Sequence, residues 1–214
     1  MKNLLYKELK LSIHPTNYLF LALPLMLLIP NYPSYVAYIY MCLSLFFLFL
    51  LARENKDVYF SSLLPIQKTD QVKARVVVVM ALELLQILIS IPFAILHFTI
   101  PIINQAGIEP NLAFFGFQFG MFAVFNLFFL TGFYKTAHKI GIPLLIAGIV
   151  SILYYILAES LVWISNPFQS FLDSTVLSVI LKQWPILLIG ITIWVCLGYI
   201  TYKISANRFL KVDV

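Results

Sequence analysis

The segment RENKDVYFSSLLPIQKTDQVKAR, residues 53–75, is the longest polar interruption in an otherwise apolar sequence. It carries five of the 14 Lys and Arg residues and three of the nine Asp and Glu residues. Apolar runs flank it on both sides, at residues 36–52 and 76–100. A charged segment between two membrane-crossing runs is exposed to water, so we interpret residues 53–75 as a docking element.

The composition indicates that the bilayer is the solvent of this chain. Its 214 residues are 62% hydrophobic and 11% charged, whereas soluble domains are about 45–50% apolar and about 25% charged. A spanning helix needs about 20 apolar residues, and six such runs use up the length. We therefore expect an all-α integral membrane protein with one transmembrane domain, residues 1–214. Its six transmembrane helices are expected at about residues 17–29, 36–52, 72–100, 112–134, 142–164 and 184–202.

The positive charges are divided unevenly between the two sides of this arrangement. The N-terminus, residues 53–75, residues 135–141 and the C-terminus form one set of polar segments, and they hold 13 of the 14 Lys and Arg residues. The other three connections hold only Lys182. Positively charged segments stay on the cytoplasmic side. The chain is therefore predicted to be a multi-pass protein of the cell membrane with both termini in the cytoplasm, and its charge indicates no nucleic acid partner.

The N-terminal residues 1–14 are too charged to cross a membrane and predict an amphipathic helix in the interface. A polar stripe and an apolar stripe lie on opposite sides of the helical wheel, with Asn3, Lys7, Lys10 and His14 expected towards headgroups and water, and Leu5, Leu9 and Ile13 opposite them. Pro15 is expected to end this helix, and Pro24 to kink the short first span. A cleaved signal peptide is disfavoured, because five more apolar runs follow.

A short helix is predicted within the docking element. Asp57 is a suitable N-cap, and Pro65 is expected to end the helix. Four apolar residues share one face, namely Tyr59, Phe60, Leu63 and Leu64. This face either enters a cleft on a partner protein or rests on lipid headgroups as part of a solvated loop. A second helix start is expected at Thr69 and Asp70, with Lys73 and Arg75 anchoring that helix at the interface.

The order of these pieces resembles a known family. An N-terminal LLYKELKLSIHP, two spans, the loop DVYFSSLLPIQKTDQVKAR and four more spans are similar to ABC-2 type transporter permeases. The chain resembles more narrowly the small six-span group that includes the permeases of the phenol-soluble modulin exporter. The most specific pieces are the KEL start and the motif Leu64-Pro65, Lys68, Asp70 and Val72 to Arg75.

The resemblance implies a function for the loop. In that family it holds a coupling helix, here about residues 57–64, which docks on a separate ABC ATPase subunit. Two permeases, identical or homologous, assemble with two ATPases, and ATP with its Mg is bound by the partner. The chain itself would then be no enzyme and bind no cofactor. The direction would be export, whereas the resemblance is silent on the substrate; an amphipathic peptide or lipid-like substrate is expected from the aromatic residues of the fourth span. The family's short extracellular helices would correspond to residues 174–182.

Polar residues follow one stripe of the third span: Glu83, Gln86, Ser90 and His97. A charged side chain at mid-helix costs about 2.5–3.5 kcal/mol on insertion scales, so Glu83 should face protein or water. In one interpretation the stripe lines a substrate path or a mobile permease interface. In the other it makes interhelical hydrogen bonds of about 0.6 kcal/mol each. An intramembrane enzyme built on Glu83 and His97 is a weaker alternative, because about 21 Å of helix separates them.

Other polar and aromatic residues of the spans favour packing roles. Glu159 is expected to reach the outer interface, and Gln118 and Asn126 to bind neighbouring helices. Phenylalanines crowd the fourth span and would suit the walls of a path for an amphipathic substrate, unless they face lipid; those considered are Phe114, Phe115, Phe117, Phe119, Phe122, Phe125, Phe128 and Phe129. The pair Gly116 and Gly120 allows close helix approach.

Catalytic and metal-binding signatures are missing from the sequence. His14, His97 and His138 have no spacing suited to a metal, and Cys42 and Cys196 lie alone in apolar runs. The motifs H-E-x-x-H, G-x-S-x-G and G-x-x-x-x-G-K-[ST] do not occur. Any ATP hydrolysis would therefore belong to a partner. An ATPase-independent channel or membrane scaffold is the alternative from a different functional class.

Overall fold

The computed structural model describes residues 2–12, 15–100, 102 and 107–212, and its regular secondary structure in these ranges is entirely helical. The expected all-α fold is confirmed. In chain order the elements are α1 Lys2–Lys7, the π-helix η1 Glu8–Ser12, α2 Pro15–Leu21, the 3-10 helix η2 Leu23–Leu28, α3 Val36–Glu54, α4 Asp57–Leu63, α5 Lys68–Thr99, α6 Leu112–Phe133, α7 Gly141–Trp163, α8 Asn166–Leu172, α9 Leu177–Ile180, the 3-10 helix η3 Leu181–Gln183 and α10 Trp184–Leu210.

Five of the described helices are long and apolar enough to cross a membrane. They are α3, α5, α6, α7, and α10 with the short helices that lead into it. The expected first span is α2 followed by η2. It makes a sixth span only when residues 15–28 are counted together with residues 4–10, from which they are bent by 82°. The described chain is thus a multi-pass membrane protein with five spans, or six if this broken pair is one span.

Prolines explain the irregular first span. The N-terminal helices end at Ser12, before Pro15 as expected, and Pro15 is the first residue of α2, where residues 15–28 are bent by 82° from residues 4–10. Proline is tolerated there because the N–H groups of the first helical turn have no partner within the helix. The α-helix ends at Leu21, and Pro24 lies in the first turn of the tighter η2. The helix thus changes from α to 3-10 geometry next to Pro24, where the sequence predicts a kink.

The N-terminal helix differs from the amphipathic helix that the sequence predicts. It is α-helical only to Lys7 and continues as the π-helix η1. Lys10 is exposed, but Lys7 is partly buried and pairs with Asp57 instead of facing headgroups. His14 and Ile13, and the side chain of Asn3, lie outside the described residues.

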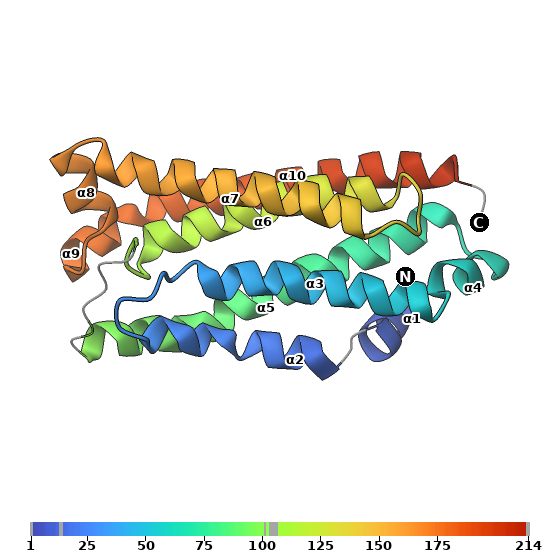
Figure 1. The fold of residues 1–214 in the computed structure, drawn as a ribbon, viewed down its shortest axis with the longest axis horizontal. Coiled ribbons are helices and arrows are strands. Elements are labelled where there is room, and N and C mark those ends of the chain that lie inside the picture. Colours follow the sequence, from blue (N-terminus) through green and yellow to red (C-terminus); the bar gives the residue numbers. More distant parts are fainter. Residues whose placement is uncertain (1, 13–14, 101, 103–106, 213–214) are drawn as a thin grey trace.

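The helices run lengthwise beside one another, with the polar segments gathered at the two ends (Figure 1). Both termini, α4 and the turn between α6 and α7 lie at one end, and α8 and α9 lie at the other (Figure 1). The set of connections that is rich in Lys and Arg therefore shares one end of the molecule. The helix α9 and the start of η3 lie within residues 174–182, where a short helix is expected before the last span, whereas α8 precedes this range.

The helix α6 is the centre of the packing. Seven of the nine phenylalanines in this helix are buried, whereas Phe117 is half-buried and Phe128 is 40% exposed. The buried side chains do not face lipid, because they fill the protein interior. Two of them, Phe115 and Phe119, also line an apolar cavity, so their interpretation as path walls stays a prediction. Gly116 lies against the backbone of Ile186 in α10, and Gly120 against the hydroxyl of Tyr154 in α7. Each glycine thus lets a different helix approach.

The length of α5 carries it beyond the hydrocarbon layer. Its 32 residues extend about 48 Å at 1.5 Å per residue, against about 30 Å of hydrocarbon. The helix begins at Lys68, four residues before the expected span, and continues through Pro92. Its first turns therefore lie at the α4 end of the molecule, beside the docking element.

Candidate functional site

Local sequence explains why α4 is a separate short helix. The chain leaves α3 through Lys56, whose left-handed backbone (φ 50°) reverses direction. The helix ends at Leu63, and Leu64 before Pro65 is extended, as the residue before a proline prefers. Gln67, not Thr69, is the N-cap of α5. The prediction that Asp57 caps α4 is also wrong, because Asp57 is the first helical residue and its carboxylate pairs with Lys7 and Arg75.

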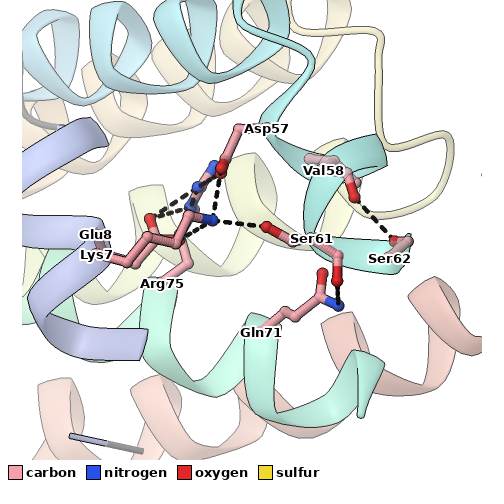
Figure 2. A network of polar contacts seen from close by, with 8 residues as sticks. All are labelled: Lys7, Glu8, Asp57, Val58, Ser61, Ser62, Gln71 and Arg75. Carbon is pink, nitrogen blue, oxygen red and sulfur yellow. Dashed lines mark hydrogen bonds and ion pairs between the residues drawn. The ribbon is translucent and has the colours of Figure 1, made fainter. Parts of the chain in front are cut away.

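A cluster of four charged side chains holds α4 in place (Figure 2). The Asp57 carboxylate lies 2.5 Å from Nζ of Lys7 and 2.5 Å from Nη2 of Arg75. The Arg75 guanidinium also donates to both carboxylate oxygens of Glu8, at 2.8 and 2.9 Å. We call Lys7, Glu8, Asp57 and Arg75 the clasp. It joins η1 and the end of α1 to α4 and to the first turns of α5.

Uncharged groups complete the attachment of α4. Nζ of Lys7 donates to the hydroxyl of Ser61 at 2.6 Å, and Nε2 of Gln71 donates to the Ser61 backbone oxygen at 3.0 Å. Ser61 is buried, so this side of α4 is fixed against the bundle. A seven-residue helix is not stable alone, and these contacts supply the stabilisation that it lacks.

The electrostatics of the clasp follow from burial and charge balance. Arg75 and Glu8 are 3% and 4% exposed, and a buried charge needs a partner. Burial by itself raises the pKa of the Asp57 carboxyl, but Arg75 and Lys7 outweigh it and hold this pKa below its usual value of 3.8. Arg75 is therefore no interfacial anchor, as the sequence suggested, but the buried centre of an ion-pair network.

The apolar face of α4 is turned away from the bundle. Tyr59, Phe60 and Leu63 are 52%, 59% and 66% exposed, and Leu64 is 39% exposed. The structure thus brings all four predicted docking residues to one exposed surface, and it puts Asp57 on the opposite, attached side. We call these four residues the docking face. A cleft of about 210 Å³ lies next to it, lined partly by Arg53, Lys56 and His138.

The C-terminal segment is fastened to the same end of the molecule. Nζ of Lys68 donates to the backbone oxygen of Val212 at 2.7 Å and lies over the ring of Phe209 at 5.5 Å from its centroid. Arg208 donates to the backbone oxygen of Thr131, the end of α6, at 2.6 Å. The beginning of α5 is therefore linked to the end of α10 as well as to α4.

The polar stripe of α5 faces the interior, and each member has its own partners. Oε2 of Glu83 accepts from Nδ2 of Asn126 at 3.0 Å and from Nε1 of Trp194 at 2.8 Å. Nε2 of Gln86 donates to the backbone oxygen of Ala37 at 3.0 Å, and the Ser90 hydroxyl bonds back to the oxygen of Gln86. Because all of these groups are buried, the stripe in this conformation makes hydrogen bonds and lines no open channel.

His97 joins two elements at the opposite end of α5. Its Nδ1 lies 2.7 Å from the backbone oxygen of Leu27, and its Nε2 lies 2.6 Å from Oε2 of Glu109. The backbone N–H of Glu109 donates to Asp173 at 2.9 Å. Burial, together with the nearby Glu109 carboxylate, raises the pKa of Asp173. The structure therefore gives His97 and Glu83 different partners, and it does not bring them together as a catalytic pair.

The remaining predicted polar residues also bind neighbouring segments. Gln118 accepts a hydrogen bond from the hydroxyl of Tyr155 in α7. Glu159 accepts one from the backbone N–H of Ile108 at 3.3 Å, so it binds the segment before α6. Among the residues that the structure describes, no three His, Cys, Asp or Glu side chains are grouped to hold a metal ion.

An apolar cavity of about 430 Å³ lies between α5, α6, α9 and α10. Leu84, Leu88, Ile91 and Ile95 of α5 contribute to its lining, with Leu187 and Ile191 of α10 among the others. None of the four stripe residues lines it. The largest apolar space among the described cavities is therefore on the face of α5 away from Glu83.

Sequence reasoning missed Glu8, Asn111, Gln183 and Trp194 as binding residues. Asn111 caps α6 and donates to the backbone oxygen of Leu172, and the Gln183 side chain bonds α6 and the end of α8. The signal for Glu8 was present, because it is an acid among cations in a chain with nine acids. Its partner is 67 positions away, so spacing gave no indication.

No family model matches this chain, and neither the search of curated proteins nor the search of solved structures found a match.

Proposed function

We propose that the chain is the permease subunit of an ATP-driven ABC exporter, and that a separate ATPase subunit hydrolyses the ATP. The observation that carries the proposal is the exposure of the docking face on a helix that the clasp holds against the bundle. An apolar surface on an anchored helix, at the cation-rich end of a membrane protein, suits insertion into a groove of a cytoplasmic partner. The resemblance to ABC-2 permeases assigns this role to the same helix.

The clasp suggests how movement of the partner reaches the membrane. Asp57 of α4 binds Arg75 of α5 directly, and Glu8 binds the same guanidinium. A displacement of α4 is therefore passed to α5 and to the N-terminal segment without an intervening flexible link. In the proposed mechanism the ATPases close on ATP, α4 moves with them, and two permease copies change from inward-facing to outward-facing.

The apolar cavity favours a hydrophobic or amphipathic substrate. Its lining from α5 and α10 lies within the membrane-spanning helices, so an acyl chain or an apolar helix face is the chemistry that fits. We base the substrate class on this cavity, to which Phe115 and Phe119 of α6 contribute, whereas most of the other phenylalanines of α6 are buried in the core.

The decisive experiment is a mild-detergent pull-down of the tagged protein from its own cells, assayed for vanadate-sensitive ATP hydrolysis. The variant Tyr59→Glu/Leu63→Glu puts two charges on the docking face. Wild type should retain a co-purifying ATPase, and the variant should lose it while remaining in the membrane.

The chain offers a matched control for this variant. Tyr6→Glu/Leu9→Glu changes the same residue types at exposed positions, 62% and 47%, of the N-terminal helices. It should keep the ATPase. If the Tyr59→Glu/Leu63→Glu variant keeps the ATPase as the control does, the docking face does not bind the ATPase and rests on lipid. If no ATPase co-purifies in any sample, an ATPase-independent channel or scaffold becomes the better proposal.

A further inference from the structure

The Glu83 carboxyl has an incomplete set of hydrogen bonds in the membrane interior. Its side chain is fully buried. Oε2 accepts two N–H groups, from Asn126 and Trp194. Oε1 has no hydrogen-bond partner, and neither has Oδ1 of Asn126. Buried polar atoms are almost always bonded, so two such oxygens on two adjoining side chains require an explanation.

A single hydrogen atom accounts for both oxygens. A carboxylic acid and a primary amide form a closed ring with two hydrogen bonds, in which the amide N–H donates to the acid carbonyl and the acid O–H donates to the amide oxygen. The bond from Nδ2 of Asn126 to Oε2 of Glu83 is one half of this ring. A proton on Oε1 supplies the donor for the other half.

The surroundings of Glu83 contain no compensating positive charge. Asn126 of α6 and Trp194 of α10 are neutral donors, and the titratable group that faces it from α3 is the buried Cys42 thiol. That thiol donates weakly to Sδ of Met121 at 3.7 Å. No Lys, Arg or His of the described part of the chain pairs with Glu83. A carboxyl group in such a site holds a proton rather than a charge.

We propose that Glu83 and Asn126 form a proton-binding site inside the membrane. The bound proton sits on Oε1 of Glu83 and is shared with Oδ1 of Asn126, while Oε2 receives the two N–H groups. The proton thereby joins α5 to α6, and Trp194 adds α10. Its removal at alkaline pH leaves acceptors facing each other at the junction of these three helices. The site does not depend on the docking of an ATPase.

Infrared spectroscopy of the full-length protein in lipid nanodiscs tests the proposal. Wild type at pH 7 should show the C=O stretch of a neutral, hydrogen-bonded carboxyl group, and Glu83→Gln should lose this band. Glu159→Gln removes a half-buried carboxyl of another spanning helix, α7, and should retain the band of Glu83. Absence of a neutral carboxyl band that depends on Glu83 at pH 7 would overturn the proposal.

Thermal unfolding distinguishes a proton bound at Glu83 from a bound metal cation. Glu83→Gln keeps both donors and acceptors of the ring, so its melting temperature should equal that of wild type at neutral pH and should lack the alkaline loss of stability. Asn126→Leu should lower the melting temperature by several degrees and shift the carboxyl band. A melting temperature of wild type that rises with Na⁺ or K⁺, and does not do so in Glu83→Gln, would show a cation in place of the proton.

Discussion

A single guanidinium, that of Arg75, determines how the N-terminal segment, α4 and α5 meet. It binds Glu8 and Asp57 at once, and it lies over the ring of Phe49 at 5.4 Å from the centroid. Because its partners are buried or nearly so, loss of any one leaves an uncompensated charge. The position of α4, and with it the docking face, therefore depends on side chains that are buried or mostly buried.

The Asp57 carboxylate should make the stability of the protein pH-dependent. Its folded-state pKa lies below the unfolded value of 3.8, so its contribution is complete above that value. The contribution disappears as the pH falls through the lower folded-state pKa. Asp57→Asn should lower the unfolding free energy by about 1–3 kcal/mol at neutral pH and should flatten the loss of stability in acid. Thermal melts between pH 3 and pH 7 measure both effects.

Glu54→Gln is the control for this measurement. Glu54 is exposed and pairs with its neighbour Arg53 at 2.6 Å, and exposed pairs contribute little. Its melting curve should follow that of wild type at every pH. An Asp57→Asn protein as stable as wild type at pH 7 would show that the clasp does not hold α4.

Among the elements, α6 shows most clearly what sequence can and cannot predict. The apolar run identifies it as a spanning helix within one residue at its end. Its phenylalanines occur on all sides of the helix, so no polar face reveals which neighbours surround it. A helix that is apolar all round is either buried or in lipid, and only the packing of α3, α7 and α10 around it decides the question.

The approach of α6 and α10 gives a prediction for one glycine. A Cβ at Gly190 would overlap the backbone carbonyl of Gly116, and backbone cannot move aside as a flexible side chain does. Gly190→Ala should therefore destabilise the protein by about 1–3 kcal/mol or more, measured by thermal unfolding in detergent.

Gly148 supplies the comparison. It lies within α7, and a Cβ there would meet nothing within 4 Å. Gly148→Ala should be neutral or stabilising by up to about 1 kcal/mol, since alanine is the better helix former. Equal effects of the two substitutions would contradict close packing at Gly190.

The docking element was predictable in outline but not in its attachments. Polar composition, the proline after Leu64 and the spacing of Tyr59 to Leu64 predict a short helix with one apolar face, and the structure contains that helix. The role of Asp57 was not predictable, because its partners Lys7 and Arg75 lie in different elements. The same holds for Glu83, whose partners come from α6 and α10.

At the scale of the whole molecule, the gathering of cations at one end makes a topology prediction. Single cysteines are introduced at His138 and at Ser170, which are exposed at opposite ends of the molecule, in a protein in which Cys42 and Cys196 are replaced by alanine. A membrane-impermeant thiol reagent should label position 170 in intact cells and position 138 only after lysis, because the cation-rich end is predicted to lie in the cytoplasm. Labelling of both positions in intact cells would refute this orientation.

The long helix α5 has a charged attachment near each end: Arg75 with Glu8 and Asp57, and His97 with Glu109. Twenty-two residues separate Arg75 from His97, about 33 Å of continuous helix. The part of α5 from Arg75 to Pro92 is stiff, so a push at the Arg75 attachment tilts or slides this part as one body. Pro92 is the weak point, because its missing N–H leaves one carbonyl unbonded. Bending should concentrate there, so the last turns of α5, which carry His97, form a separate mechanical segment.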